Sequence, residues 1–122
     1  SSSAASDVYK RQLWTTSDQA EFASGLRCIA GHEPVLDMMG RIVDYQHWGL
    51  GRIGGARYKG GWNYHEGGHL ARQFGLIPGP HGDIAVAITA HSPKGYEGSF
   101  AMLDELADGL SAMRGDLPTS RC

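Results

Sequence analysis

Two short stretches of the 122-residue sequence place reactive side chains close together. One is YKGGW at 58–62 and the other is HEGGH at 65–69. A lysine at the head of a strand, followed by two glycines, lets a substrate approach the strand edge closely with an ammonium beside it. The second stretch matches the H-E-x-x-H pattern of zinc metallopeptidases.

The zinc chemistry of HEGGH requires a helix, because only there do His65 and His69 share a face with Glu66 beside them as general base. Gly67 and Gly68 each disfavour a helix by about 1 kcal/mol relative to alanine. In a strand, positions four apart lie about 13 Å from each other, too far for two ligands of one zinc ion unless a tight turn brings them together. We therefore interpret HEGGH as a glycine hairpin turn with two solvated histidines, and a zinc site is the alternative.

The elements that position these residues follow from the hydrophobic periodicity. We expect helices near 16–30, 34–43 and 96–114, and strands near 56–63, 69–77 and 83–91. Strands separated by short turns form antiparallel hairpins, and the apolar run in the last strand indicates a central position that is buried on both faces. The sequence thus predicts an α+β fold, with the last helix covering one face of the sheet and the first two helices more peripheral.

The two N-terminal helices carry local signals of their own. Thr16 and Gln19 have the spacing of a capping box, and Gly31 is expected to end the first helix. A methionine pair in the second helix suits an adaptable binding groove, but the interpretation we favour is gap-filling in the core. The stripes expected to be buried are Phe22, Leu26 and Ile29 in the first helix, and Val35, Met38, Met39, Ile42 and Val43 in the second.

Charge and composition exclude several function classes. The chain has 11 basic and 13 acidic residues, for a net charge of −2, and no basic patch indicates a nucleic-acid partner. No apolar stretch is long enough to span a membrane. Two cysteines are too few for a disulfide scaffold. Cys28 and Cys122 either pair with each other or leave Cys122 as a terminal thiol.

The first twelve residues lack the apolar periodicity of the rest of the chain. The run SSAASDVYKRQ at 2–12 can be written in codons that reproduce, base for base, a common transposase-type sequencing adapter. We therefore expect residues 1–12 to be translated adapter, with a genuine serine-rich tail as the alternative. On this interpretation the gene was cut at Leu13, so that 13–114 is the C-terminal portion of a larger domain and 115–122 is a tail.

Taken together, these motifs make the chain similar to serine hydrolases of the class A β-lactamase and penicillin-binding-protein type. The resemblance covers nearly all of 13–114, through TTSDQAEF, VLDMM, WGL, the hairpin and the long C-terminal helix. KGGW is the counterpart of the Lys-Thr-Gly strand motif, which takes a K-x-G-W form in some relatives. The resemblance implies the C-terminal part of a β-lactamase or transpeptidase-like fold, an antiparallel sheet covered by helices. In the intact family fold, N-terminal strands and a helix add to this sheet.

The resemblance also implies roles for individual residues. In that family the serine of a Ser-x-x-Lys motif is acylated by the substrate carbonyl, and water later releases the product. Lys59 would hold the substrate and tune the proton network, and the backbone N–H of Trp62 would belong to the oxyanion hole. Gly61 matches the motif glycine, whereas Gly60 replaces a threonine whose hydroxyl binds the substrate carboxylate. Arg72 is a candidate to bind that carboxylate instead.

This chain does not contain the family's nucleophile. Neither Ser-x-x-Lys nor Ser-Asp-Asn occurs in it, since the similar Ser17–Asp18–Gln19 lies at a helix start. We expect a parent enzyme without a cofactor, acting on β-lactam, peptide or ester bonds in the periplasm, outside the cell or at its surface, and an inactive fragment. A zinc peptidase and a non-catalytic member of the fold are the alternatives. One sheet edge and part of the last helix are expected to be left uncovered.

Overall fold

A three-stranded antiparallel sheet forms the middle of the structure, a computed structural model that describes residues 15–65 and 67–122. The strands are β1 (Arg57–His65), β2 (Gly68–Gly79) and β3 (Gly82–Ser92), in the order β1-β2-β3. The three predicted strands are confirmed, and their ends agree within two residues. The central strand is β2, however, and not the apolar β3, whose two faces are covered by helices.

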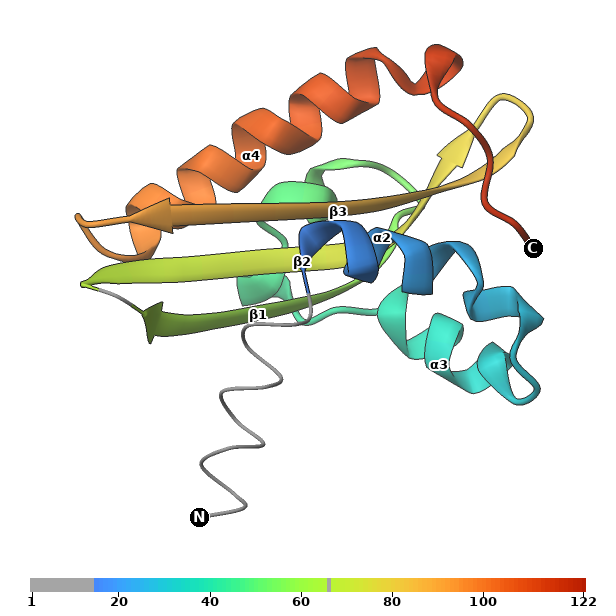
Figure 1. Cartoon of the computed structure of the whole chain (residues 1–122), viewed down its shortest axis with the longest axis horizontal. Coiled ribbons are helices and arrows are strands. Elements are labelled where there is room, and N and C mark those ends of the chain that lie inside the picture. The colour runs from blue at the N-terminus through green and yellow to red at the C-terminus, as the bar shows by residue number, and fades with distance from the viewer. Residues whose placement is uncertain (1–14, 66) are drawn as a thin grey trace.

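Helices lie on both faces of the sheet (Figure 1). The long α4 (Tyr96–Ala112) packs against one face, while α2 (Thr16–Ser24) and α3 (His32–Met39) pack against the other. The α+β class expected from the sequence is confirmed in the described residues. Short 3₁₀ helices complete the structure: η1 (Leu26–Cys28), η2 (Asp44–Gln46), η3 (Gly49–Arg52) and η4 (Arg114–Asp116).

One apolar cluster lies on each face of the sheet, because alternate side chains of a strand point to opposite sides. The cluster under α4 is the larger one, and it also contains residues of η3. The cluster under α2 and α3 is smaller: Ala23, Leu26, Leu36, Met39 and Leu76, with Phe74 and Ala85 packed against it. The first two helices are therefore a second layer on the sheet rather than peripheral elements.

The first helix is shorter than the sequence predicts. It ends at Ser24, where Gly25 caps it, and Gly31 has a φ of 84° just before α3. The capping box is formed one residue earlier than predicted, by Thr15 and Asp18. The Thr15 hydroxyl accepts the Asp18 N–H at 3.0 Å, and the Asp18 carboxylate accepts the Thr15 N–H at 3.2 Å.

The apolar stripe predicted for the second helix is confirmed at Met39 and in part at Ile42, but wrong at the other three positions. Leu36 and Met39 are the buried side chains, whereas Val35 and Val43 are exposed and Met38 is 61% exposed. A helix of only eight residues with apolar side chains around its circumference does not fix its own rotation, so packing on the sheet decides it. Met38 is therefore free of the core that the sequence assigned to it.

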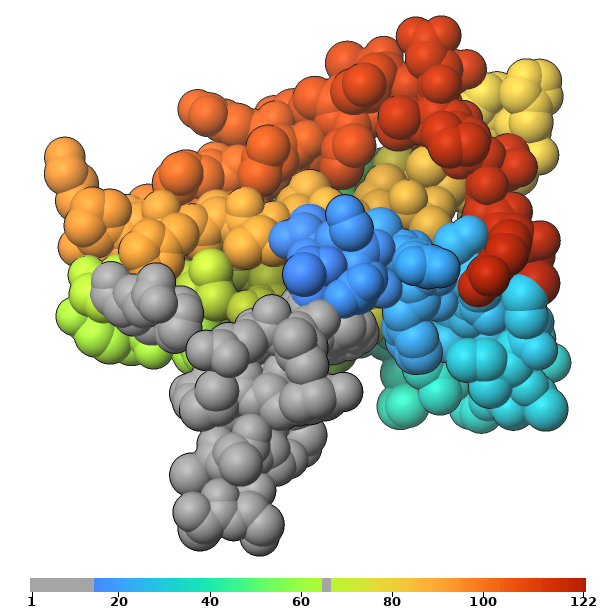
Figure 2. All heavy atoms as spheres, viewed as in Figure 1, coloured from blue at the N-terminus to red at the C-terminus, as the bar shows by residue number. Residues whose placement is uncertain are grey.

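The C-terminal residues return across the molecule to α2. The Ser120 N–H donates to the Asp83 carbonyl at 2.7 Å, and the Cys122 N–H donates to the Ser24 carbonyl. Cys122 forms a disulfide with Cys28, with Cα atoms 5.6 Å apart, so the two cysteines do pair. Figure 2 shows these red C-terminal residues against the blue and cyan residues of α2 and η1.

The sheet is open at both sides within 15–65 and 67–122. Each of β1 and β3 pairs with a strand on one side only. Met102 and Leu106 of α4, and Met113 just after it, are more than 40% exposed. Whether missing strands and a helix would cover them stays a prediction. None of the described helices is long and apolar enough to cross a membrane.

Candidate functional site

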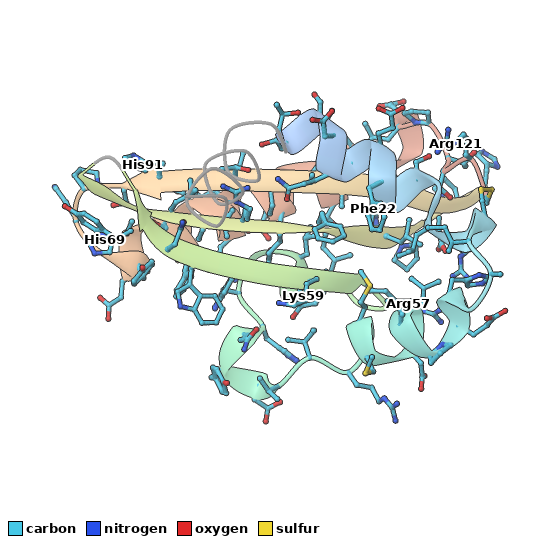
Figure 3. The ribbon with its side chains drawn as sticks, turned by 60° about the horizontal axis from the view of Figure 1, so that its bottom comes forward. Phe22, Arg57, Lys59, His69, His91 and Arg121 are labelled. Carbon is cyan, nitrogen blue, oxygen red and sulfur yellow. A yellow bond between two sulfur atoms is a disulfide. The ribbon has the colours of Figure 1, made fainter. Side chains whose placement is uncertain are left out.

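The KGGW stretch lies on β1, beside the central strand. Lys59 is paired with Phe74, and Gly61 is paired with Arg72. Since Phe74 packs with the cluster under α2 and α3, Lys59, Gly61 and Arg72 all belong to that face of the sheet. Arg72 thus lies on the same face as Lys59, a point that the sequence left open. Figure 3 shows Lys59 near Arg57 at the start of β1, and His69 of β2 at the far end of the sheet.

Lys59 and Arg72 are cations on this face, together with Arg57 at the start of β1. The Nζ of Lys59 donates to the backbone carbonyl of Gly60, a neutral acceptor. Neither Lys59 nor Arg72 is among the ion pairs formed by residues 15–65 and 67–122. Their positions in the register make them diagonal neighbours on adjacent strands, a separation that long side chains can span. The arrangement suits the carboxylate or the developing negative charge of a ligand.

The backbone of β1 turns alternate N–H and C=O groups toward the open edge. A Cβ on Gly75 would overlap the Arg57 carbonyl oxygen, so that oxygen points toward β2. Backbone groups reverse direction at each residue, which turns those of Gly60 and Trp62 away from β2. The hydrogen bond from Lys59 to the Gly60 carbonyl agrees with this direction. By the same alternation the N–H of Trp62 faces the open edge, two residues along β1 from the Gly60 carbonyl that Lys59 contacts.

The two glycines of KGGW have different surroundings. A Cβ on Gly60 would meet the Trp48 ring at 3.1 Å, on the face under α4. A Cβ on Gly61 would have no neighbour within 4 Å. Packing against Trp48 therefore favours glycine at position 60. Nothing in the packing of the described residues requires glycine at position 61.

The side chain of Trp62 anchors β1 on the α4 face. Its ring meets those of Trp48 and Phe100 edge-on, with centroids 5.9 and 6.3 Å away, and the side chain remains 43% exposed. Trp48 and Phe100 in turn stack at 4.1 Å. The ring of Trp62 thus fixes the strand from one side while its backbone N–H stays at the edge.

Gln73 is a positioning residue that sequence reasoning missed. It is fully buried, and its side-chain carbonyl accepts the Leu50 N–H while its amide donates to the Trp48 carbonyl, both at 2.7 Å. These bonds hold the Trp48 loop behind Gly60. The available signal was a polar residue between Ala71 and Gly75 in the alternation of β2 that faces α4.

HEGGH spans the turn between β1 and β2, which confirms the predicted hairpin. β1 ends at His65 and β2 begins at Gly68, with a φ of 77° at Gly67 between them. The helix that zinc peptidase chemistry needs is therefore not formed by the described residues of this stretch. Glu66 and the side chain of His65 lie outside the described part of the structure. No group of three metal-ligating side chains occurs among the residues it does describe.

His69 is not the solvated histidine that the sequence suggested. Its ring is half-buried between Tyr64 and Tyr96, with centroids 5.2 and 4.6 Å away and both contacts edge-on. The Nδ1 atom is buried and has no hydrogen-bond partner within the described residues. Because His69 is paired with Tyr64 and lies on the α4 face, it is separated by the sheet from Lys59.

Comparison of the chain with protein-family models, with curated proteins and with solved structures finds no match. The functional interpretation therefore rests on two kinds of observation. One is the order of the sequence motifs, and the other is the geometry of the β1 edge around Lys59 and Trp62.

Proposed function

We propose that this chain is the C-terminal portion of a serine hydrolase of the β-lactamase and penicillin-binding-protein type. The observation that carries the proposal is the edge of β1 without a strand partner in the described residues, where the Lys59 ammonium contacts the Gly60 carbonyl and the strand register turns the Trp62 N–H outward. An acyl-transfer site needs fixed donors where the oxyanion develops, and a fixed backbone N–H on a sheet edge meets that need at no cost in reorganisation.

Each residue of the edge then has a role toward the substrate. The scissile carbonyl accepts a hydrogen bond from the Trp62 N–H, and the open backbone at Gly61 permits close approach. Lys59 holds the substrate and tunes the proton of the nucleophile. Arg72 binds the substrate carboxylate, replacing the threonine hydroxyl that Gly60 lacks. The exposed position of Lys59 and the half-buried position of Arg72 on one face support this division.

The nucleophile comes from a part of the parent protein outside this sequence. A serine Oγ, deprotonated by an adjacent base, bonds to the carbonyl carbon, and the leaving group departs with that proton. Water then cleaves the acyl-serine ester, releasing the acid and restoring the serine. The two strand edges without strand partners support further strands on this sheet, and the disulfide supports an oxidising compartment.

The test begins with recovery of the reading frame upstream of Leu13. We expect it to encode Ser-x-x-Lys, and the purified full-length protein to be labelled at that serine by a fluorescent penicillin. Residues 1–122 alone should not turn over nitrocefin, a p-nitrophenyl ester or a D-Ala-D-Ala peptide, because they lack the nucleophile. A frame without Ser-x-x-Lys would instead indicate a non-catalytic member of the fold.

Variants of the full-length protein test the site itself. Lys59→Ala should lower kcat/KM by roughly 10² or more, as expected for loss of one preorganised electrostatic group. Lys94→Ala is the matched control, since Lys94 is an exposed lysine in the turn between β3 and α4. An unchanged rate in folded Lys59→Ala would make the site assignment wrong. Turnover by residues 1–122 that a chelator abolishes would point to HEGGH.

A further inference from the structure

The face that carries Lys59 also contains an apolar pocket of about 340 Å³. It lies between α2, α3 and the sheet, and its lining consists of Phe22, Leu26, Val35, Met38, Met39, Ile42, Phe74 and Lys59. Small-molecule sites begin at about 300 Å³ and combine apolar walls with a few polar groups that fix orientation. The pocket has both properties, with seven apolar residues and one charged residue in its lining.

The mouth of this pocket is unusually apolar for a surface. Phe22, Val35 and Met38 all line it and are 42–61% exposed. Met38 has an unbranched, polarizable side chain that can adjust to the shape of a ligand. Figure 3 shows Phe22 on α2 and Lys59 on β1, which belong to two different elements of the lining. Because the exposed rings and thioethers lose contact with water when a chain enters, an apolar ligand is favoured.

The charge of the lining selects the headgroup. Within 15–65 and 67–122, Lys59 is the only charged residue in the lining, and its ammonium bonds a backbone carbonyl and no carboxylate. We propose that the pocket binds an amphipathic monocarboxylate, with the hydrocarbon chain among the apolar side chains and the carboxylate on Lys59. A ligand carboxylate replaces the neutral Gly60 carbonyl as the acceptor, and a charge-assisted hydrogen bond is the stronger one.

The pocket opens beside the candidate acylation site, since both use Lys59. If the proposed function is correct, this ligand is the substrate, and it carries an acyl chain next to its carboxylate. This identification rests on the proposed function. The binding itself does not, because residues 1–122 contain the whole lining. Failure of one proposal can thus be told apart from failure of the other.

The first experiment is calorimetric titration of residues 1–122 with decanoate, decanol and decylammonium. Decanoate should bind with 1:1 stoichiometry and more tightly than decanol, and decylammonium should bind weakest. Shortening the chain to hexanoate should weaken binding by up to about fourfold per methylene removed. Decylammonium binding as tightly as decanoate would overturn the role of Lys59.

Three variants locate the site. Lys59→Met keeps the apolar stem without the charge. It should weaken the binding of decanoate about tenfold and leave the affinity for decanol unchanged. Met38→Ser should weaken the binding of both ligands. Met102→Ser is the matched control, because Met102 is an exposed methionine on α4, on the other face of the sheet. Equal losses in Met38→Ser and Met102→Ser would mean non-specific binding and would overturn the proposal.

Two further outcomes separate the alternatives. Sedimentation should show a monomer, with no second copy seated on the pocket. A dimer that Met38→Ser dissociates, in a chain that fails to bind decanoate, would overturn the ligand proposal. Decanoate binding together with an upstream frame that lacks Ser-x-x-Lys would overturn the proposed function alone. Turnover by the full-length protein without decanoate binding would overturn the pocket proposal alone.

Discussion

Two neighbouring residues of β2, Arg72 and Gln73, lie on opposite faces of the sheet and differ in their polar contacts. On the α4 face, the buried Gln73 makes two hydrogen bonds to the loop before β1, and Asp104 of α4 accepts the Gly49 N–H. On the α2 and α3 face, Lys59 and Arg72 have no acidic partner among the described residues. Gln73 and Arg72 are neighbours in the sequence. The same strand therefore holds the loop before β1 through Gln73 on one face and presents the charge of Arg72 on the other.

The glycines of KGGW repeat this contrast within two residues. Gly60 lies against Trp48 on the α4 face, where no side chain fits without displacing the ring. Gly61 faces open space on the side of Lys59. A position that packing leaves free and that still lacks a side chain is where a ligand can reach the backbone. The contrast supports our proposal that a ligand reaches the backbone on the face that carries Lys59.

Of the changes considered, removal of the disulfide should have the largest effect on the stability of the chain. Cys28 and Cys122 are 94 positions apart, and closing a loop of that length restricts the unfolded chain by about 4 kcal/mol. Cys122→Ser should therefore lower the free energy of unfolding in urea by a comparable amount. Because the bond joins the C-terminal residues to η1, hydrogen exchange should rise more in α2 than in α4. Equal rises in both helices would contradict this picture of two independently held faces.

Replacement of Gln73 tests the polar network of the α4 face. Gln73→Leu keeps the volume but leaves the Leu50 N–H and the Trp48 carbonyl without their partner, at a cost of about 3 kcal/mol. Arg72→Leu is the matched control on the other face and should change stability by less than about 0.5 kcal/mol. Urea denaturation measures both. A similar loss in the two variants would remove the distinction between the faces.

Threonine at the two glycines gives a smaller effect. Gly60→Thr should destabilise the chain by about 2 kcal/mol, because the new side chain presses on Trp48. Gly61→Thr meets no neighbour and should stay within about 0.5 kcal/mol. Thermal unfolding of both variants measures the difference. Comparable destabilisation would show that Gly61 too is required by packing.

Much of the sheet could be predicted from the sequence. Turn residues such as Gly67 and Gly82 mark the hairpins, and the strands between them match within two residues. The last helix was also found within two residues at its end, because its apolar stripe is long. The short helices were not, since Gly25 ends α2 six residues before the expected Gly31. Local signals compete there, and tertiary packing chooses between them.

The candidate site could be predicted only in part. KGGW drew attention by its residue types, but its facing depends on the register that pairs Gly61 with Arg72. Shifting that register by one residue would reverse the face of every side chain, and no sequence pattern fixes it here. The fit of Trp48 against Gly60 and the pocket around Met38 join residues from distant segments. Such contacts become visible only once the chain is folded.

The smallest effect we expect comes from an exposed ion pair on the α4 side. Arg52 of η3 donates from Nε and Nη2 to the two carboxylate oxygens of Asp108, both at 2.9 Å. The hydrogen bond from Arg52, together with its charge, lowers the pKa of Asp108, while partial desolvation opposes the shift. A lowered pKa in the folded state means that the unfolded chain takes up the proton more readily. The stabilisation is therefore present above the unfolded value of about 4 and is lost as the pH falls through the folded pKa.

Asp108→Asn should remove this pH dependence. The melting temperature of the variant should fall less steeply between about pH 5 and pH 3 than that of the unchanged chain, because the paired carboxylate is gone. At neutral pH the two should differ only slightly, and less at high salt, since solvent screens exposed pairs. The decanoate affinity of the variant should be unchanged, because Asp108 lies across the sheet from Lys59. A parallel loss of decanoate binding would mean that the two faces of the sheet are coupled rather than independent.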